Sequence, residues 1–93
     1  MSAFQPKISI IIPVHNEADH IKKVLRTISN HTGSNYFKEV LVIDGGRTDK
    51  TCANAIELGA TVIRSKKGRS VQMNVGAKHA TGDLLYFLHV DSL

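Results

Sequence analysis

The chain has 93 residues, and its 12 Lys and Arg against 8 Asp and Glu give a formal net charge of +4 with His counted as neutral. Hydrophobic residues make up 42% and charged residues 22%, which excludes a disordered polar chain, a collagen-like chain and a low-complexity chain. The length allows one domain at most, residues 1–93. A charge excess of this size does not indicate nucleic-acid binding, and it suits an anionic small molecule equally well.

The single cysteine, Cys52, excludes an internal disulfide framework and a multi-cysteine metal site. We interpret it as a small buried apolar residue. The longest apolar runs, residues 8–14 and 84–88, are far shorter than the roughly 20 residues that span a bilayer. Because residues 1–7 lack the apolar segment of a signal peptide, we expect a cytoplasmic protein with no transmembrane segment.

The first predicted strand is Ile8–Val14, which is rich in β-branched residues and apolar on both faces, as in a strand buried on both sides. Pro13 has no N–H to donate to a neighbouring strand, so it should end this one. Asn16 is a good N-cap for a following helix. The apolar face of that helix recurs at i, i+3, i+4 and i+7, as Ile21, Val24, Leu25 and Ile28. We expect a loop over residues 30–35.

A second strand-helix unit follows the same logic. We predict a buried strand over Glu39–Ile43 that stops at the Asp-Gly-Gly turn of residues 44–46. Thr48 or Asp49 suits the N-cap of the next helix. This helix ends near Leu58, and Gly59 suits the position just after its end.

The rest of the chain predicts a short strand at residues 61–63, a basic loop at 66–69, a helix at 70–80 and a buried strand at 84–88. Strands alternating with helices indicate right-handed crossovers. We therefore predict an α/β, Rossmann-like fold of order βαβαβαβ, with about four parallel strands and helices on both faces. Ligands of such sheets bind at the carboxyl ends of the strands, so the segments leaving those ends should converge on one crevice.

Three common motifs are absent from the sequence: a glycine-rich dinucleotide turn after the first strand, a P-loop and a serine nucleophile elbow. The segments present instead are ISIIIPVHNE, VIDGGRTDKT and QMNVGAKHATGDLLYFLHVD. Together they resemble the amino-terminal half of family 2 glycosyltransferases, which are nucleotide-sugar-dependent enzymes of the GT-A fold. The stretch FLHVDS is similar to a subgroup whose metal motif reads F-L-H-x-D-T. Each motif alone is weak. The third segment holds two motifs, N-V-G and H-V-D, and four motifs in this order at strand ends form a specific signal.

The resemblance implies a nucleotide pocket. The residues that match the first motif, whose backbone and acid line the nucleoside pocket, are Pro13, Val14, Asn16 and Glu17. Asp44 matches the acid that hydrogen-bonds the nucleobase, and its carboxylate can accept from a uracil-type N–H. Asn74 and Gly76 match the R-N-x-G motif, in which Met73 replaces Arg. Arg69, four residues before Met73 on the same helix face, can supply the positive charge.

The resemblance also implies a divalent cation, Mg²⁺ or Mn²⁺, held on the diphosphate of the sugar nucleotide. Asp91 matches the last acid of the D-x-D metal motif, and His89 stands where the commoner pattern has the first Asp. A neutral imidazole is a softer, uncharged ligand, which changes metal affinity or choice. One alternative is that His89 contacts phosphate or ribose. A separate alternative is that Asp91 is a frayed terminal residue with no ligand.

For each of five other features near the strand ends, two interpretations remain open. Asp49 matches a second acid of the family pattern but also suits a helix N-cap. Arg47 is either an exposed loop residue or a phosphate contact. Residues 66–69 are either solvated or, because they follow the third strand, in contact with phosphate. Gln72 either reaches the ligand or satisfies neighbouring backbone, and His15 either faces the pocket or has a structural role.

The function implied is transfer of a sugar from a nucleoside-diphosphate sugar, guessed as UDP-type, to an unidentified acceptor, with this chain supplying the donor-binding half. The catalytic base is expected beyond Leu93, so we expect a truncated chain that is weakly stable or self-associates through the face where later elements would pack. The alternatives are a non-catalytic nucleotide-binding module, an inactive fragment or a plain α/β structural domain. Failure to bind any nucleotide would favour the last of these.

Overall fold

The computed structural model describes residues 6–15, 18–31, 37–46 and 49–89. Its elements are β1 (Ile8–Val14), α1 (Ala18–His31), β2 (Phe37–Asp44), α2 (Asp49–Glu57), β3 (Thr61–Arg64), α3 (Arg69–His79) and β4 (Leu84–Phe87). All neighbouring strands pair in parallel, in the order β3-β2-β1-β4. The predicted α/β fold, its four parallel strands and its βαβαβαβ order are confirmed.

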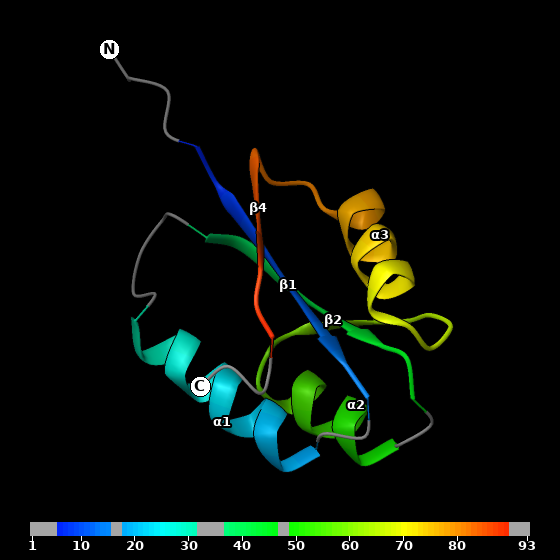
Figure 1. Ribbon diagram of the computed structural model, residues 1–93. Coiled ribbons are helices and arrows are strands. Elements are labelled where there is room, and N and C mark those ends of the chain that lie inside the picture. Colours follow the sequence, from blue (N-terminus) through cyan, green and yellow to red (C-terminus); the bar gives the residue numbers. More distant parts are fainter. Residues whose placement is uncertain (1–5, 16–17, 32–36, 47–48, 90–93) are drawn as a thin grey trace.

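Helices cover both faces of the sheet, as predicted. Figure 1 shows α1 and α2 together on one side of the strands and α3 on the other. The cluster between the sheet and these two helices includes Ile10, Ile12, Val14 and Val42 of the strands and Ile21, Val24 and Leu25 of α1. The cluster beneath α3 consists of Ile11, Leu41 and Ile43, with Val75 and Ala80 packed against it. The central strands are apolar on both faces because both faces are buried.

Pro13 lies inside β1, so the prediction that it ends the strand is wrong. Ile11 O accepts a hydrogen bond from Leu88 N at 2.9 Å, on the β4 side. Val14 O accepts from Gly45 N at 3.0 Å, on the β2 side. Backbone groups alternate between sides along a strand, so the N–H that Pro13 lacks would point toward β4. Pro13 thus ends the pairing with β4, which stops before it, while the pairing with β2 continues beyond it.

Several element ends differ from the prediction. α1 continues to His31, so the first two residues of the expected loop are helical. β2 begins at Phe37, and Arg69, expected in the basic loop, is the first residue of α3. Gly59 has φ +89°, the left-handed conformation expected of the residue after the end of α2. The expected N-cap Asn16 and the side chains of Asp49 and Cys52 lie outside the described part of the chain.

The prediction that the last strand is buried is wrong. Leu84, Leu85 and Tyr86 are 52%, 41% and 56% exposed. Their apolar character resembles that of a central strand, yet β4 lies at an edge of the sheet. Local sequence does not distinguish an edge strand from a central one, because the difference depends on what packs beside it.

α3 approaches the sheet closely at Gly76. A Cβ atom there would clash with Cγ2 of Ile11 and would lie 3.2 Å from Cγ1 of Ile43, so a larger residue would push the helix away. Gly76 and Gln72 are the two buried residues of α3 and lie one turn apart. The close approach brings the first turn of α3 against the carboxyl ends of β1 and β2.

A hydrogen-bond network joins the α3–β4 loop to the amino-terminal ends of β1 and β2. Ser9 is fully buried; its Oγ donates to Glu39 Oε2 at 2.7 Å and accepts from Gly82 N at 2.8 Å. Glu39 Oε2 also accepts from Thr81 N at 2.6 Å and Thr81 Oγ1 at 3.0 Å. Burial alone would raise the pKa of Glu39, but the hydrogen bonds from Ser9 and Thr81 outweigh it and lower this pKa.

Among the described residues, none of the helices combines the length and apolar character needed to cross a bilayer.

Candidate nucleotide site at the carboxyl ends of the strands

The segments that leave β1, β2 and β3 are joined by backbone hydrogen bonds. Gly45 N donates to Val14 O at 3.0 Å, which links the end of β2 to the end of β1. Ser65 N donates to Asp44 O at 3.0 Å, which links the segment after β3 to the end of β2. The structure therefore brings these three segments together, as expected for a parallel sheet.

A pocket of about 190 Å³ opens at this end of the sheet. Its lining residues are Pro13, Val14, His15, Lys67, Gly68, Arg69 and Gln72. The end of β1 forms one wall, and the basic segment leading into α3 forms the other. Lys67 and Arg69 carry positive charge, and no carboxylate is among the described residues that line the pocket. This composition suits an anionic ligand.

Two predicted site residues, Asp44 and Asn74, do not line the pocket. Asp44 is fully buried at the end of β2, and its Oδ1 accepts from Gly46 N at 2.8 Å. Asn74 is exposed on α3, and the structure does not bring it to the pocket. Because two residues correspond to more than half a helical turn, Asn74 and the buried Gln72 point in different directions. The roles expected of Asp44 and Asn74 stay predictions.

Four other candidates, Asn16, Glu17, Arg47 and Asp91, lie outside the described residues. His15 is exposed and lines the pocket, and both of its interpretations stay predictions. Lys67 and Arg69 also line the pocket, whereas Lys66 does not. The basic segment is thus divided between the pocket and solvent.

His89 is the described candidate for a metal ligand. It follows β4, and its Nδ1 atom is buried with no hydrogen-bond partner among the described residues. An imidazole nitrogen without a partner can coordinate a divalent cation. Among the described residues, no three His, Cys, Asp or Glu side chains lie close enough together to hold a metal ion by themselves. A cation bound to His89 would take its remaining ligands from groups such as a diphosphate and water, as Mg²⁺ commonly does.

Gln72 is one of the residues for which the sequence left two interpretations open. It is 5% exposed, and its Nε2 donates to both Val14 O and Ile43 O at 2.8 Å. It therefore satisfies backbone groups, as one interpretation held, but those of two distant strands rather than of its neighbours. The available signal was a polar residue four positions before Gly76, on the helix face that meets the sheet.

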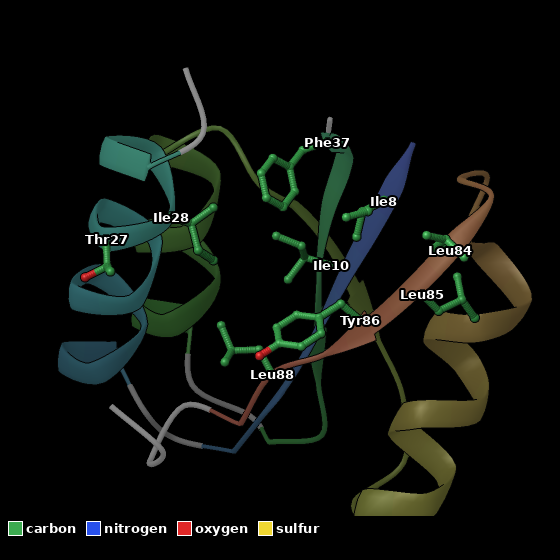
Figure 2. Close-up of a pocket in the computed structure, with 9 residues that line it drawn as sticks. All are labelled: Ile8, Ile10, Thr27, Ile28, Phe37, Leu84, Leu85, Tyr86 and Leu88. Carbon is green, nitrogen blue, oxygen red and sulfur yellow. The ribbon is translucent and has the colours of Figure 1, made fainter. Parts of the chain in front are cut away.

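A larger groove of about 690 Å³ lies elsewhere, between the sheet and α1 beside β4. Figure 2 shows Ile10, Phe37 and Tyr86 projecting from the sheet toward Ile28 of α1. The described residues that line this groove are uncharged, with Thr27 and Tyr86 supplying its hydroxyls. Such a surface is unsuited to a diphosphate and suits an apolar partner.

Comparison with known proteins gives the same family. Residues 9–93 match the model of glycosyl transferase family 2. The chain is also 32% identical over 98 residues to the glycosyltransferase AglE of Haloferax volcanii, a match that covers 98% of this chain and 32% of that protein. The subgroup inferred from FLHVDS stays a prediction.

Two solved structures share the fold. Glucosyl-3-phosphoglycerate synthase of Mycobacterium tuberculosis, in complex with Mn²⁺, UDP and glucosyl-3-phosphoglycerate, has a TM-score of 0.76 at 27% identity, covering 91% of this chain and 33% of that one. The mannosyltransferase PcManGT of Pyrobaculum calidifontis, in complex with GDP-Man and Mn²⁺, has a TM-score of 0.78 at 25% identity, covering 98% and 29%. The chain thus spans about a third of the length of these relatives. From its sequence match and its fold, the chain belongs to glycosyl transferase family 2.

Proposed function

We propose that this chain supplies the donor-binding half of a glycosyltransferase that transfers a sugar from a nucleoside-diphosphate sugar to an acceptor. The observation that carries the proposal is the pocket at the carboxyl ends of the strands, with Lys67 and Arg69 on its wall. Of the relatives compared above, one structure contains UDP with Mn²⁺ and the other contains GDP-Man with Mn²⁺. A UDP-type donor is our first choice, and GDP is the competitor to test.

In this proposal the two walls of the pocket divide the ligand between them. The backbone of Pro13 and Val14 borders the nucleoside, and Asp44 accepts a hydrogen bond from the base. Lys67 and Arg69 balance the diphosphate charge, helped by the positive end of the α3 dipole. Asn16, Glu17 and Asn74 belong to the same proposal through their match to the family motifs.

A divalent cation, Mg²⁺ or Mn²⁺, is part of the proposal, with His89 and Asp91 as its protein ligands. When bound, such a cation neutralises charge that develops on the departing nucleoside diphosphate. The support from this chain is the buried Nδ1 of His89. No described residue is assigned as the base that deprotonates the acceptor.

A non-catalytic nucleotide-binding module is the alternative function, because it would use the same pocket. Turnover of a sugar nucleotide, by this chain or by a longer reading frame that contains it, would distinguish an enzyme from such a module. A cytoplasmic location stays a proposal, supported by the single cysteine. The lack of a nucleic-acid partner also stays a proposal, supported by the modest net charge.

We also propose that copies of this chain associate through the face formed by β4 and the apolar groove. β4 is an edge strand, and Leu84 and Tyr86 on it are each more than half exposed. None of the described strands pairs with the outer edge of β4, and such an edge beside an apolar groove favours pairing with another chain. We propose a second copy of this chain as the partner at this face, because a purified sample contains no other protein.

Calorimetric titration with UDP and with GDP, each with and without Mn²⁺, tests the proposed function. We expect one nucleotide to bind, and to bind more tightly with the metal. Lys67→Ala should weaken binding, whereas Lys66→Ala should not, because only Lys67 lines the pocket. Absence of binding by both nucleotides under all conditions would contradict the proposal.

A further inference from the structure

We propose that Gln72 is a positioning residue that holds the two walls of the nucleotide pocket at a fixed separation. The inference rests on the proposed function, because it concerns the same pocket. It assigns a role to a side chain that need not touch the reacting atoms of the sugar nucleotide. The structural basis is a single buried carboxamide that bonds to the ends of two strands from the helix that carries Arg69.

The hydrogen bonds of Gln72 use the full donor capacity of its amide. A carboxamide nitrogen carries two N–H groups, and Nε2 donates to two acceptors, Val14 O and Ile43 O, at 2.8 Å each. Val14 O also accepts from Gly45 N at 3.0 Å. The ends of β1 and β2 therefore meet at one junction that includes Gln72. Because Gln72 is 5% exposed, water does not readily replace it there.

Gly45 makes room for this junction. A Cβ atom on Gly45 would lie 2.8 Å from Cδ of Gln72 and 2.9 Å from its Oε1. The amide plane thus lies against the backbone directly after Asp44, whose Oδ1 accepts from Gly46 N at 2.8 Å. A shift of Gln72 would therefore move the backbone that orients Asp44.

The same residue also fixes the basic wall. Gln72 N donates to Gly68 O at 2.9 Å, which closes the first turn of α3 around Arg69. Since Gly76 fixes the distance of α3 from the sheet one turn later, the side chain of Gln72 sets how the first turn meets the strand ends. Through its backbone and its amide, Gln72 connects the segment of Lys67 and Arg69 to that of Val14 and Asp44.

The test compares the parent chain with Gln72→Met, which keeps an unbranched side chain of similar length but has no donor. Two readouts are measured: hydrogen exchange of the Gly45 amide, and the affinity for UDP with Mn²⁺. We expect exchange at Gly45 to become about tenfold faster relative to amides in the middle of β1 and β2. The dissociation constant should rise about tenfold, the change expected for loss of roughly one net hydrogen bond.

Two further variants separate positioning from general loss of stability. Val75→Ala weakens the packing of α3 on the sheet without removing the Gln72 bonds, so both readouts should stay within about twofold of the parent. Gly45→Ala displaces the amide from the opposite side and should reproduce the effect of Gln72→Met. The double variant should then be no worse than either single one, because both remove the same junction. Gly45→Ala also decides the matter if Gln72→Met does not fold.

The outcomes distinguish this inference from the proposed function. Unchanged exchange at Gly45 in Gln72→Met overturns it, as does an equal effect in Val75→Ala. Faster exchange with unchanged affinity also overturns the positioning role and leaves Gln72 a structural residue. If the parent binds neither UDP nor GDP, the proposed function fails, and the positioning role for that ligand fails with it. The exchange measurement then still reports whether the junction exists.

Discussion

Ser9 and Glu39, from adjacent strands, share a hydrogen bond of 2.7 Å in which a fully buried hydroxyl donates to a carboxylate. The same carboxylate oxygen accepts two hydrogen bonds from Thr81. Glu39 is therefore the point at which β1, β2 and the loop before β4 are joined. This network lies at the end of the sheet opposite the pocket, so it bears on folding rather than on ligand binding.

The first prediction concerns stability against pH. The pKa of Glu39 is lowered from its ordinary value of 4.5, so its ionised form stabilises the fold above that pH, and this contribution is lost as pH falls through the lowered folded-state pKa. Glu39→Gln keeps one acceptor oxygen but loses the charge that strengthens its hydrogen bonds, so it should destabilise the chain at pH 7 by about 1 kcal/mol and reduce the loss of stability on acidification. Urea unfolding at pH 7 and pH 4 measures both effects.

The control for this prediction is Glu57→Gln, the same change at an exposed residue of α2. It should leave the stability at pH 7 within about 0.5 kcal/mol of the parent. If Glu39→Gln and the parent lose stability equally on acidification, the network does not stabilise the fold as argued.

The second prediction concerns Asp44. Asp44→Asn keeps an acceptor for Gly46 N, so the turn after β2 should persist, but it replaces one carboxylate oxygen by a donor. We expect the free energy of UDP binding to become less favourable by about 1–3 kcal/mol, the usual cost of a mispaired buried polar group. Asp83→Asn is the matched control, because Asp83 is exposed and accepts from Lys7 N near the opposite end of the sheet. Equal UDP affinity for parent and Asp44→Asn would remove Asp44 from base recognition.

The sequence predicted the elements well because strand and helix patterns are local. Runs of β-branched residues mark β1 and β2, and the 3.6-residue period marks α1. What it missed depends on distant partners. Gln72 bonds to residues 58 and 29 positions away, which no short spacing reveals. The exposure of β4 and the place of Pro13 within β1 likewise depend on strand order, which the prediction of a parallel sheet left open.

The third prediction concerns self-association. Tyr86→Lys places a charge on the exposed strand and in the apolar groove, so it should shift the chain toward monomer. Sedimentation velocity over a concentration series measures the distribution. Ile56→Lys is the control, since Ile56 is 62% exposed on α2 and does not line the groove. A parent that is monomeric throughout, or an equal shift in both variants, would contradict the proposed association face.

The last prediction concerns the metal. If His89 Nδ1 coordinates a cation together with the diphosphate, Mn²⁺ should increase the affinity of the parent for UDP, and His89→Ala should lose most of that increase. Binding without metal should change little, because the imidazole is expected to act through the cation. Asp91→Ala should behave in the same way, from its match to the acid of the metal motif.

His79→Ala is the control for this prediction, since His79 is exposed on α3 and its Nδ1 lies 2.9 Å from Val75 O. Its response to Mn²⁺ should equal that of the parent. Titration of UDP with and without Mn²⁺ into the parent and the three variants gives the comparison. If the metal increases affinity equally in parent and His89→Ala, the buried Nδ1 is not a ligand. Equal UDP affinity with and without metal, in parent and Asp91→Ala alike, would remove Asp91 from the site.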